Sequence, residues 1–135
     1  MRKSILIMAM LVVCNILLSV SFTEDVVSGL IPMERSCAAW GDYDNDGDQD
    51  LLITGSDGGS SYSDAMTKLY RNDGGNNFTE IETHNLPQIF GRFDWGDYDN
   101  DGDLDIALTG TTYDSENITA VYNYDAVSGS FTPVT

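Results

Sequence analysis

A nine-residue acidic segment occurs twice in this chain of 135 residues, and it restricts the possible folds more than any other feature. Residues 40–48 read Trp-Gly-Asp-Tyr-Asp-Asn-Asp-Gly-Asp, and residues 95–103 repeat the same letters. The residues that follow also correspond, because residues 50–55 resemble residues 105–110. Such self-similarity at a fixed spacing is typical of tandem copies of one structural unit, so the fold is expected to be built from repeats.

Each copy of the unit contains four short segments that favour β-structure, separated by clusters of Gly, Asn, Asp and Ser. The segments are residues 36–40, 50–54, 67–72 and 77–82 in the first copy and 91–95, 105–109, 119–124 and 130–134 in the second. Four strands in a unit of this length are typical of a propeller blade. We therefore predict an all-β fold with two four-stranded antiparallel propeller-type blades. One extra N-terminal strand is predicted near Phe22, and the two blades and this strand together would form an incomplete β-propeller.

The first 21 residues have the pattern of a secretory signal peptide. Arg2 and Lys3 precede the apolar run 5–18, and the small residues at 19–21 offer a cleavage site. The run is shorter than the roughly 20 residues that a membrane-spanning helix needs, although an uncleaved anchor is the alternative. The chain is therefore expected to be secreted, outside the cell or at its surface, with no membrane attachment after cleavage. The predicted organisation is a signal peptide at 1–21, an outer strand and linker at 22–35, a first blade at 36–90 and a second at 91–135.

The charge of the chain excludes two classes of partner. Asp and Glu number 22 against 6 Lys and Arg, which gives a formal net charge of −16. Nucleic-acid binders need basic patches to neutralise phosphates, and docking on anionic lipid needs the same sign of charge. We therefore expect neither a nucleic acid nor an anionic membrane as the partner.

The acidic residues of the repeated segment have the spacing of cation ligands. Loop positions are counted from the first Asp of each segment, which is Asp42 or Asp97. Carboxylates stand at loop positions one, three, five and nine: Asp42, Asp44, Asp46 and Asp50 in one copy, and Asp97, Asp99, Asp101 and Asp105 in the other. Carboxylates this close disfavour one another's ionisation unless a cation compensates them. A curled loop can aim alternating side chains at one centre, with Gly47 and Gly102 at a sharp turn that favours positive φ. Flexible, multiply anionic oxygen ligands favour Ca²⁺ over Mg²⁺, and neither loop offers a His or Cys for a transition metal. The sequence predicts two calcium sites, and a solvated acidic turn is the alternative.

An EF-hand begins with a similar loop but does not fit. Its loop needs a bidentate Glu at the twelfth position and a helix on each side. The twelfth positions here are Ile53 and Leu108, and both lie in segments with strand character.

The repeated unit resembles the integrin-α-type FG-GAP repeat, and still more the related bacterial VCBS-type repeat. The resemblance covers residues 22–135, and the family's Gly-Asp-x-Asp-x-Asp-Gly-x-x-Asp loop is matched twice. It implies Ca²⁺ bound by the four Asp side chains of each loop and by the backbone carbonyl of Asp48 or Asp103. Propellers of this family typically have seven blades, and about four is the usual minimum for a closed ring. Two blades are too few to close a ring, and three explanations are open. The chain is a fragment of a longer protein, it assembles with other copies of itself, or its two blades form an open pair. We favour the first.

These features favour a secreted calcium-binding repeat module with structural Ca²⁺, serving adhesion or the binding of an extracellular protein or glycan. The alternative is a non-catalytic or scaffold part of a secreted enzyme that acts on polysaccharides or lipids. The sequence contains no Ser-His-acid pattern with a nucleophile elbow, no zinc motif and no acid pair separate from the calcium loops. We therefore predict that the chain is not itself an enzyme.

Five further side chains carry expectations of their own. Trp40 and Trp95 are expected to pack between neighbouring blades, with a sugar-stacking surface as the alternative. Tyr43 and Tyr98 occupy the second loop position, where they would point away from the metal and could face a ligand. His84 lies in a polar segment and is expected to be exposed to solvent.

Overall fold

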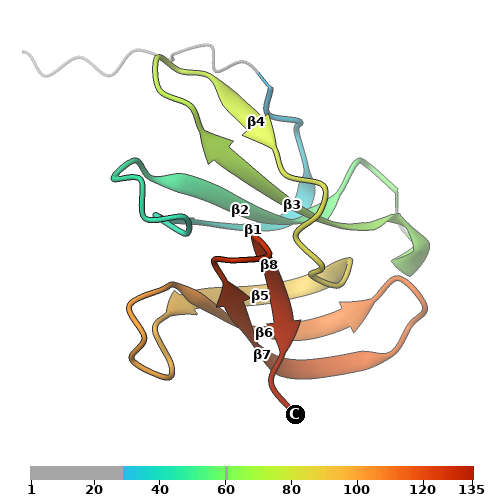
Figure 1. Ribbon diagram of the computed structural model, residues 1–135. Coiled ribbons are helices and arrows are strands. Elements are labelled where there is room, and N and C mark those ends of the chain that lie inside the picture. The colour runs from blue at the N-terminus through green and yellow to red at the C-terminus, as the bar shows by residue number, and fades with distance from the viewer. Residues whose placement is uncertain (1–28, 60) are drawn as a thin grey trace, which may run out of the picture.

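The computed structural model describes residues 29–59 and 61–135. The predicted signal peptide at 1–21 and the extra strand near Phe22 lie outside these residues. The described part contains eight strands in two four-stranded antiparallel sheets (Figure 1). The first sheet consists of β1 (Glu34–Gly41), β2 (Asp50–Ser56), β3 (Ala65–Asn72) and β4 (Phe78–Glu80). The second consists of β5 (Ile89–Gly96), β6 (Asp105–Thr112), β7 (Asn117–Asp125) and β8 (Ser130–Pro133).

The prediction of an all-β fold with two four-stranded sheets is confirmed, and the sheets do not close into a ring. In each sheet the strands pair in the order in which they occur along the chain, as in a propeller blade. A short 3₁₀ helix, η1 (Tyr62–Asp64), lies between β2 and β3. No helix in the described part of the chain is long and apolar enough to cross a membrane.

The register of the first hairpin is the same in both sheets. Gly41 pairs with Asp50 across β1 and β2, and Gly96 pairs with Asp105 across β5 and β6. Equivalent pairs of residues therefore close the base of each acidic loop, at the same end of the two hairpins.

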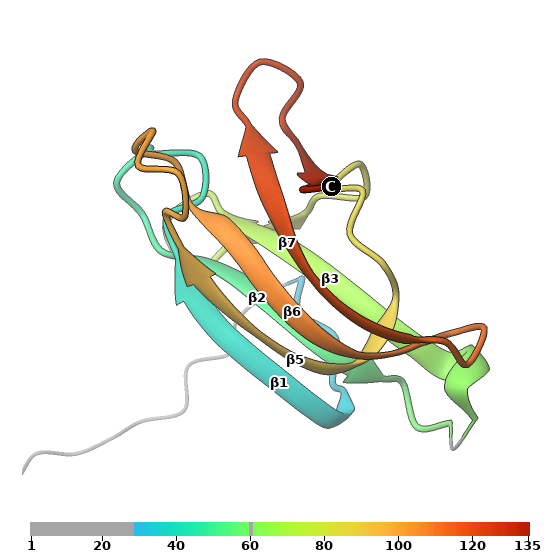
Figure 2. The same cartoon turned by 90° about the horizontal axis from the view of Figure 1, so that it is seen from below.

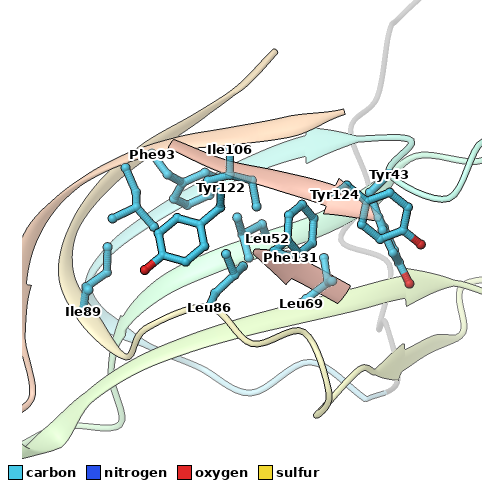
Figure 3. Packing of buried hydrophobic residues seen from close by; sticks show 11 residues of the cluster. Tyr43, Leu52, Leu69, Leu86, Ile89, Phe93, Ile106, Tyr122, Tyr124 and Phe131 are labelled. Atoms are coloured by element: carbon cyan, nitrogen blue, oxygen red, sulfur yellow. The ribbon is translucent and has the colours of Figure 1, made fainter. Parts of the chain in front are cut away.

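The core of the molecule lies between the two sheets (Figure 3). Successive strand residues point to opposite faces, so in β6 Ile106 and Leu108 are buried while Ala107 and Thr109 are exposed. The buried cluster comprises Tyr43, Leu52, Leu69, Leu86, Ile89, Phe93, Ile106, Leu108, Tyr122, Tyr124 and Phe131. Residues of both sheets contribute to it, so each sheet covers an apolar face of the other.

The two repeated tryptophans differ in what covers them. Trp95 packs towards the core, where its ring centroid lies 6.2 Å from that of Phe131 and its Nε1 donates a 3.4 Å hydrogen bond to the Ala39 carbonyl. Trp40 forms the equivalent pair with Phe78 at 6.0 Å, but it lies on the outer face of the first sheet and is 56% exposed. Packing between blades is therefore confirmed for Trp95, and it does not hold for Trp40 within the described residues.

Two expectations about exposure are wrong, since both side chains are enclosed between the sheets. His84 is only 6% exposed, and its Nδ1 accepts a 2.9 Å hydrogen bond from the Leu86 backbone N–H. In the connection from β4 to β5 the side chains of Thr83 and Asn85 are exposed while that of His84 between them is buried, and this burial lowers the pKa of His84. Tyr43 is 4% exposed and meets the Tyr124 ring edge to face at 5.4 Å instead of facing a ligand. Its counterpart Tyr98 is 49% exposed.

Two equivalent glycines test the packing between the sheets. A Cβ at Gly41 would lie 2.9 Å from Cε2 of Trp95, whereas a Cβ at Gly96 would meet nothing within 4 Å. We expect Gly41→Ala to lower the free energy of unfolding by about 1–3 kcal/mol, as overpacking does. Gly96→Ala should leave it unchanged or slightly raise it, because alanine restricts the unfolded chain. Chemical denaturation of both variants measures the difference, and equal effects would contradict the packing of Trp95 on the first sheet.

Candidate metal centres

The two acidic loops, residues 42–49 and 97–104, lie side by side at one end of the molecule (Figure 2). Each connects the first two strands of its sheet, so the paired ends of these strands fix where the loop starts and stops. A 2.7 Å hydrogen bond from Asn45 Nδ2 to Asp103 Oδ1 joins one loop directly to the other. The two candidate centres are therefore neighbours, although their residues are far apart in the sequence.

Both loops follow the same backbone path. Gly47 and Gly102 each have a φ of 97°, which confirms the predicted turn at these glycines. Asn45 and Asn100 also have positive φ, at 59° and 62°. Asparagine tolerates this left-handed conformation better than most residues do, so the repeated Asn was an available signal for a second turn. Two such residues curl each loop so that its alternating side chains can converge.

Three carboxylates converge in each loop. One oxygen each of Asp42, Asp44 and Asp50 lies within 4.8 Å of the others, and Asp97, Asp99 and Asp105 form the same arrangement. These are the first, third and ninth of the predicted ligand positions. We refer to the two sets as the first and second triad.

The other four predicted positions lie in the same loops but outside the triads. The fifth-position carboxylates accept bonds from their own loops, since Asp46 Oδ1 takes the Asp48 N–H and Asp101 Oδ1 takes the Asp103 N–H, both at 2.9 Å. The side chain of Asp103 binds Asn45 of the neighbouring loop. The structure thus brings together six of the ten predicted residues, and the remaining four border them.

The ninth-position carboxylate is the most firmly held member of each triad. Asp50 is fully buried, and its two oxygens accept backbone N–H groups of Tyr43 at 3.1 Å and Asn72 at 2.8 Å. Asp105 is 1% exposed and accepts the equivalent bonds from Tyr98 at 2.9 Å and from the backbone of β7 at 3.0 Å. Each triad is therefore anchored to the loop and to the third strand of its sheet by one rigid carboxylate.

In the absence of a cation the first triad is electrostatically unfavourable. Burial raises the pKa of Asp50 to about 6, against the lowering effect of its two backbone hydrogen bonds, and the charges of Asp44 and Asp46 raise it further. Burial is also the main cause that raises the pKa of Asp44, followed by the charge of Asp46. In the second triad the pKa of Asp99 is raised by desolvation and then by its acidic neighbours. A positive charge at either centre would offset this cost of keeping the carboxylates ionised.

Two oxygens of the first triad have no hydrogen-bond partner in the part of the chain that the structure describes. Asp42 Oδ1 and Asp44 Oδ1 are both shielded from solvent, and no donor among the described residues reaches them. A buried acceptor without a partner costs about 1–3 kcal/mol, and more when it is charged. A cation that both oxygens coordinate would remove this cost, so the donor set fits a bound metal ion.

The second triad has a donor that sequence reasoning missed. Asn123 Nδ2 donates to Asp99 Oδ2 at 3.1 Å and to Asp105 Oδ1 at 3.2 Å. Asn123 lies on β7, well beyond the loop, so nothing in the spacing of the acidic residues pointed to it. This amide satisfies part of the second triad where the first triad has oxygens without partners.

Comparison with known proteins agrees with this geometry. Residues 42–108 match the FG-GAP-like repeat family, and the matched segment contains both triads. No curated protein and no solved structure matches the chain. FG-GAP repeats are generally structural or binding modules and are typically extracellular. Residues 42–108 are therefore an FG-GAP-like repeat segment.

Proposed function

We propose that the chain is a secreted, calcium-binding repeat module of the β-propeller type, with one structural Ca²⁺ in each acidic loop. The observation that carries this proposal is the first triad, whose three carboxylates converge and in which two shielded oxygens have no hydrogen-bond donor among the described residues. The second triad supports it because the same three loop positions converge there.

The chemistry of the ligands favours calcium. Each centre offers carboxylate oxygens alone as charged ligands, and Ca²⁺ takes six to eight oxygens in a flexible shell. Besides the triads, the resemblance to FG-GAP repeats implies that the side chains of Asp46 and Asp101 and the backbone carbonyls of Asp48 and Asp103 would complete the two shells. Extracellular calcium modules bind at about 10⁻⁴ to 10⁻³ M, which suits a site outside the cell.

A bound calcium ion would act mainly on the structure. Each triad joins a loop to the first residue of the following strand, and the ninth-position carboxylate also holds the third strand. Neutralising the carboxylates would therefore fix the end of the molecule at which the two loops meet. The function that follows is adhesion, or the binding of an extracellular protein or glycan, without catalysis by this chain and without a nucleic-acid partner.

Calorimetric titration with calcium tests the two sites separately. We expect wild-type protein to bind two Ca²⁺, Asp44→Asn and Asp99→Asn each to bind one, and the double variant to bind none. These substitutions keep the shape of the side chain and remove one charged ligand. Asp57→Asn is the matched control, because Asp57 is exposed and lies outside both loops, and it should bind as wild type does. Absence of binding at millimolar calcium, or undiminished binding in the double variant, would overturn the proposal.

A further inference from the structure

A pocket at the opposite end of the sheets from the acidic loops gathers an unusual set of side chains. It is lined by Arg35, Ser36 and Cys37 of β1, by Phe90, Gly91 and Arg92 of β5, and by Tyr62 of η1. The first strand of each sheet thus begins at this pocket and ends at a triad, about 20 Å further along. Figure 2 shows the loops at one end of the molecule and η1 at the other. We call this site the arginine pocket.

The arginine pocket contains two cations that form no ion pair with an acidic residue of the described part of the chain. Four basic residues lie in the described part of the chain, and two of them, Lys68 and Arg71, form ion pairs with acidic residues. Arg35 and Arg92 have no ion pair within that part, and both line the pocket. In a chain with a net charge of −16, two guanidinium groups that form no ion pair within the described residues therefore line one site.

The backbone of β1 is irregular at Arg35, whereas the equivalent strand β5 of the second sheet is regular. Arg35 has a φ of 51°, and the pairing of β1 with β2 shifts between Glu34 and Cys37. The equivalent strand β5 pairs with β6 without a break from Ile89 to Gly96. β-Bulges redirect a side chain, and a left-handed non-glycine residue persists only where its surroundings hold it. The irregularity therefore gives the Arg35 side chain a direction that a regular strand would not give it.

Two aromatic rings complete the pocket. Tyr62 and Phe90 meet at 5.9 Å between centroids with 67° between their planes, and Tyr62 is 49% exposed. The loop that carries Tyr62 is held by a capping box, in which Ser61 and Asp64 each bind the other's backbone N–H. The exposed ring thus has a fixed backbone beneath it and a second ring beside it. The site combines an apolar platform with two cationic donors, which is the usual composition of a specific ligand pocket.

We propose that the arginine pocket binds an acidic sugar, with its carboxylate or sulfate group between the guanidiniums of Arg35 and Arg92 and its apolar face on Tyr62. Guanidinium groups match the planar oxygens of such anions and form charge-assisted, often bidentate, hydrogen bonds. An aromatic ring with a polar tip suits a ligand that is apolar on one face and hydrated on the other. A neutral sugar would leave the arginines without partners, and a cation would be repelled by them. The proposal rests on the binding role given above and names its ligand class, but it requires no contact with either triad.

Titration of calcium-loaded protein with three sugars of equal length tests this assignment. An oligogalacturonate supplies carboxylates, a sulfated galactose oligomer supplies sulfates, and a neutral galactose oligomer supplies neither. We expect at least one acidic sugar to bind, with an affinity that falls as salt is added, and the neutral one not to bind. The acidic sugar that binds identifies the anionic group. Failure of both acidic sugars, or equal binding of the neutral one, overturns the proposal.

Matched variants place the binding in the pocket. Arg35→Gln and Arg92→Gln should each weaken binding of the acidic sugar about ten- to a hundredfold, the loss expected for one charged hydrogen-bonding group. Arg71→Gln removes the same charge near the acidic loops and should leave sugar binding within about twofold of wild type. Undiminished binding in both pocket variants would overturn the proposal. Calcium isotherms on the same samples keep the two hypotheses apart, since a protein that binds two Ca²⁺ and no acidic sugar refutes the pocket alone.

Discussion

Chelation of calcium is expected to lower the melting temperature of the calcium-saturated chain by about 20–40 °C. A ligand at about a hundred times its dissociation constant stabilises the folded state by about 2.7 kcal/mol per site, so two sites contribute about 5 kcal/mol. In a domain of this size each kcal/mol shifts the melting temperature by about 4–8 °C. Thermal unfolding followed by circular dichroism, with calcium and then with excess chelator, measures the shift.

The design of the chelation experiment follows from the triads. Re-addition of calcium should restore the melting temperature, and magnesium should restore much less of it, because Mg²⁺ demands a smaller and more regular shell. The Asp44→Asn/Asp99→Asn double variant should melt at the same temperature in both buffers. If the wild-type protein also melts alike with calcium and with chelator, the metal ions do not have the structural role proposed here.

The parts of the fold that follow a local pattern were predictable from the sequence. All eight strands lie where the alternating segments and the Gly, Asn and Asp clusters placed them, with ends that differ by a few residues. The repeat reinforced this prediction, because each copy of the unit gave the same four segments. The turns at Gly47 and Gly102 were predictable because glycine adopts positive φ readily, whatever its neighbours are.

The parts that depend on contact between the two sheets were not predictable. His84 lies in a segment of polar composition, and only the path of that segment between the sheets buries it. Tyr43 and Tyr98 occupy the same position of the same loop motif, yet only Tyr43 has a second sheet to cover it. Identical sequence in the two copies therefore gives different burial, because each copy has a neighbour on a different side.

The candidate sites also differ in whether they depend on local spacing or on contacts between separate segments. Ligand spacing within a loop placed the two triads, since their members are close in sequence and the loop alone can bring them together. The Asn45–Asp103 bond and the donor Asn123 join residues from separate segments, and no spacing rule indicated either. The arginine pocket was missed for the same reason, because Arg35 and Arg92 converge only when the sheets stack.

Loss of the Phe131 ring is expected to destabilise the folded chain by about 3–5 kcal/mol, the usual cost of removing a buried aromatic side chain. Phe131 is 1% exposed, and its ring lies between those of Tyr43, Trp95 and Tyr124, with centroid distances of 6.4, 6.2 and 5.0 Å. Phe131→Ala would open a cavity where residues of both sheets meet. Chemical denaturation of the calcium-saturated protein measures the change in the free energy of unfolding.

The repeat supplies the control for this substitution. Phe78 occupies the equivalent place beside Trp40, on the outer face of the first sheet, and is only half-buried. Phe78→Ala should therefore cost about 1 kcal/mol, because Phe78 is only partly buried and less apolar surface is lost than at Phe131. Phe131→Ala should also weaken calcium binding in the first loop more than in the second, since Tyr43 packs on Phe131 and its N–H holds Asp50. Equal destabilisation by the two substitutions would mean that the sheets do not pack through this aromatic cluster, and the first triad would lose its support from the second sheet.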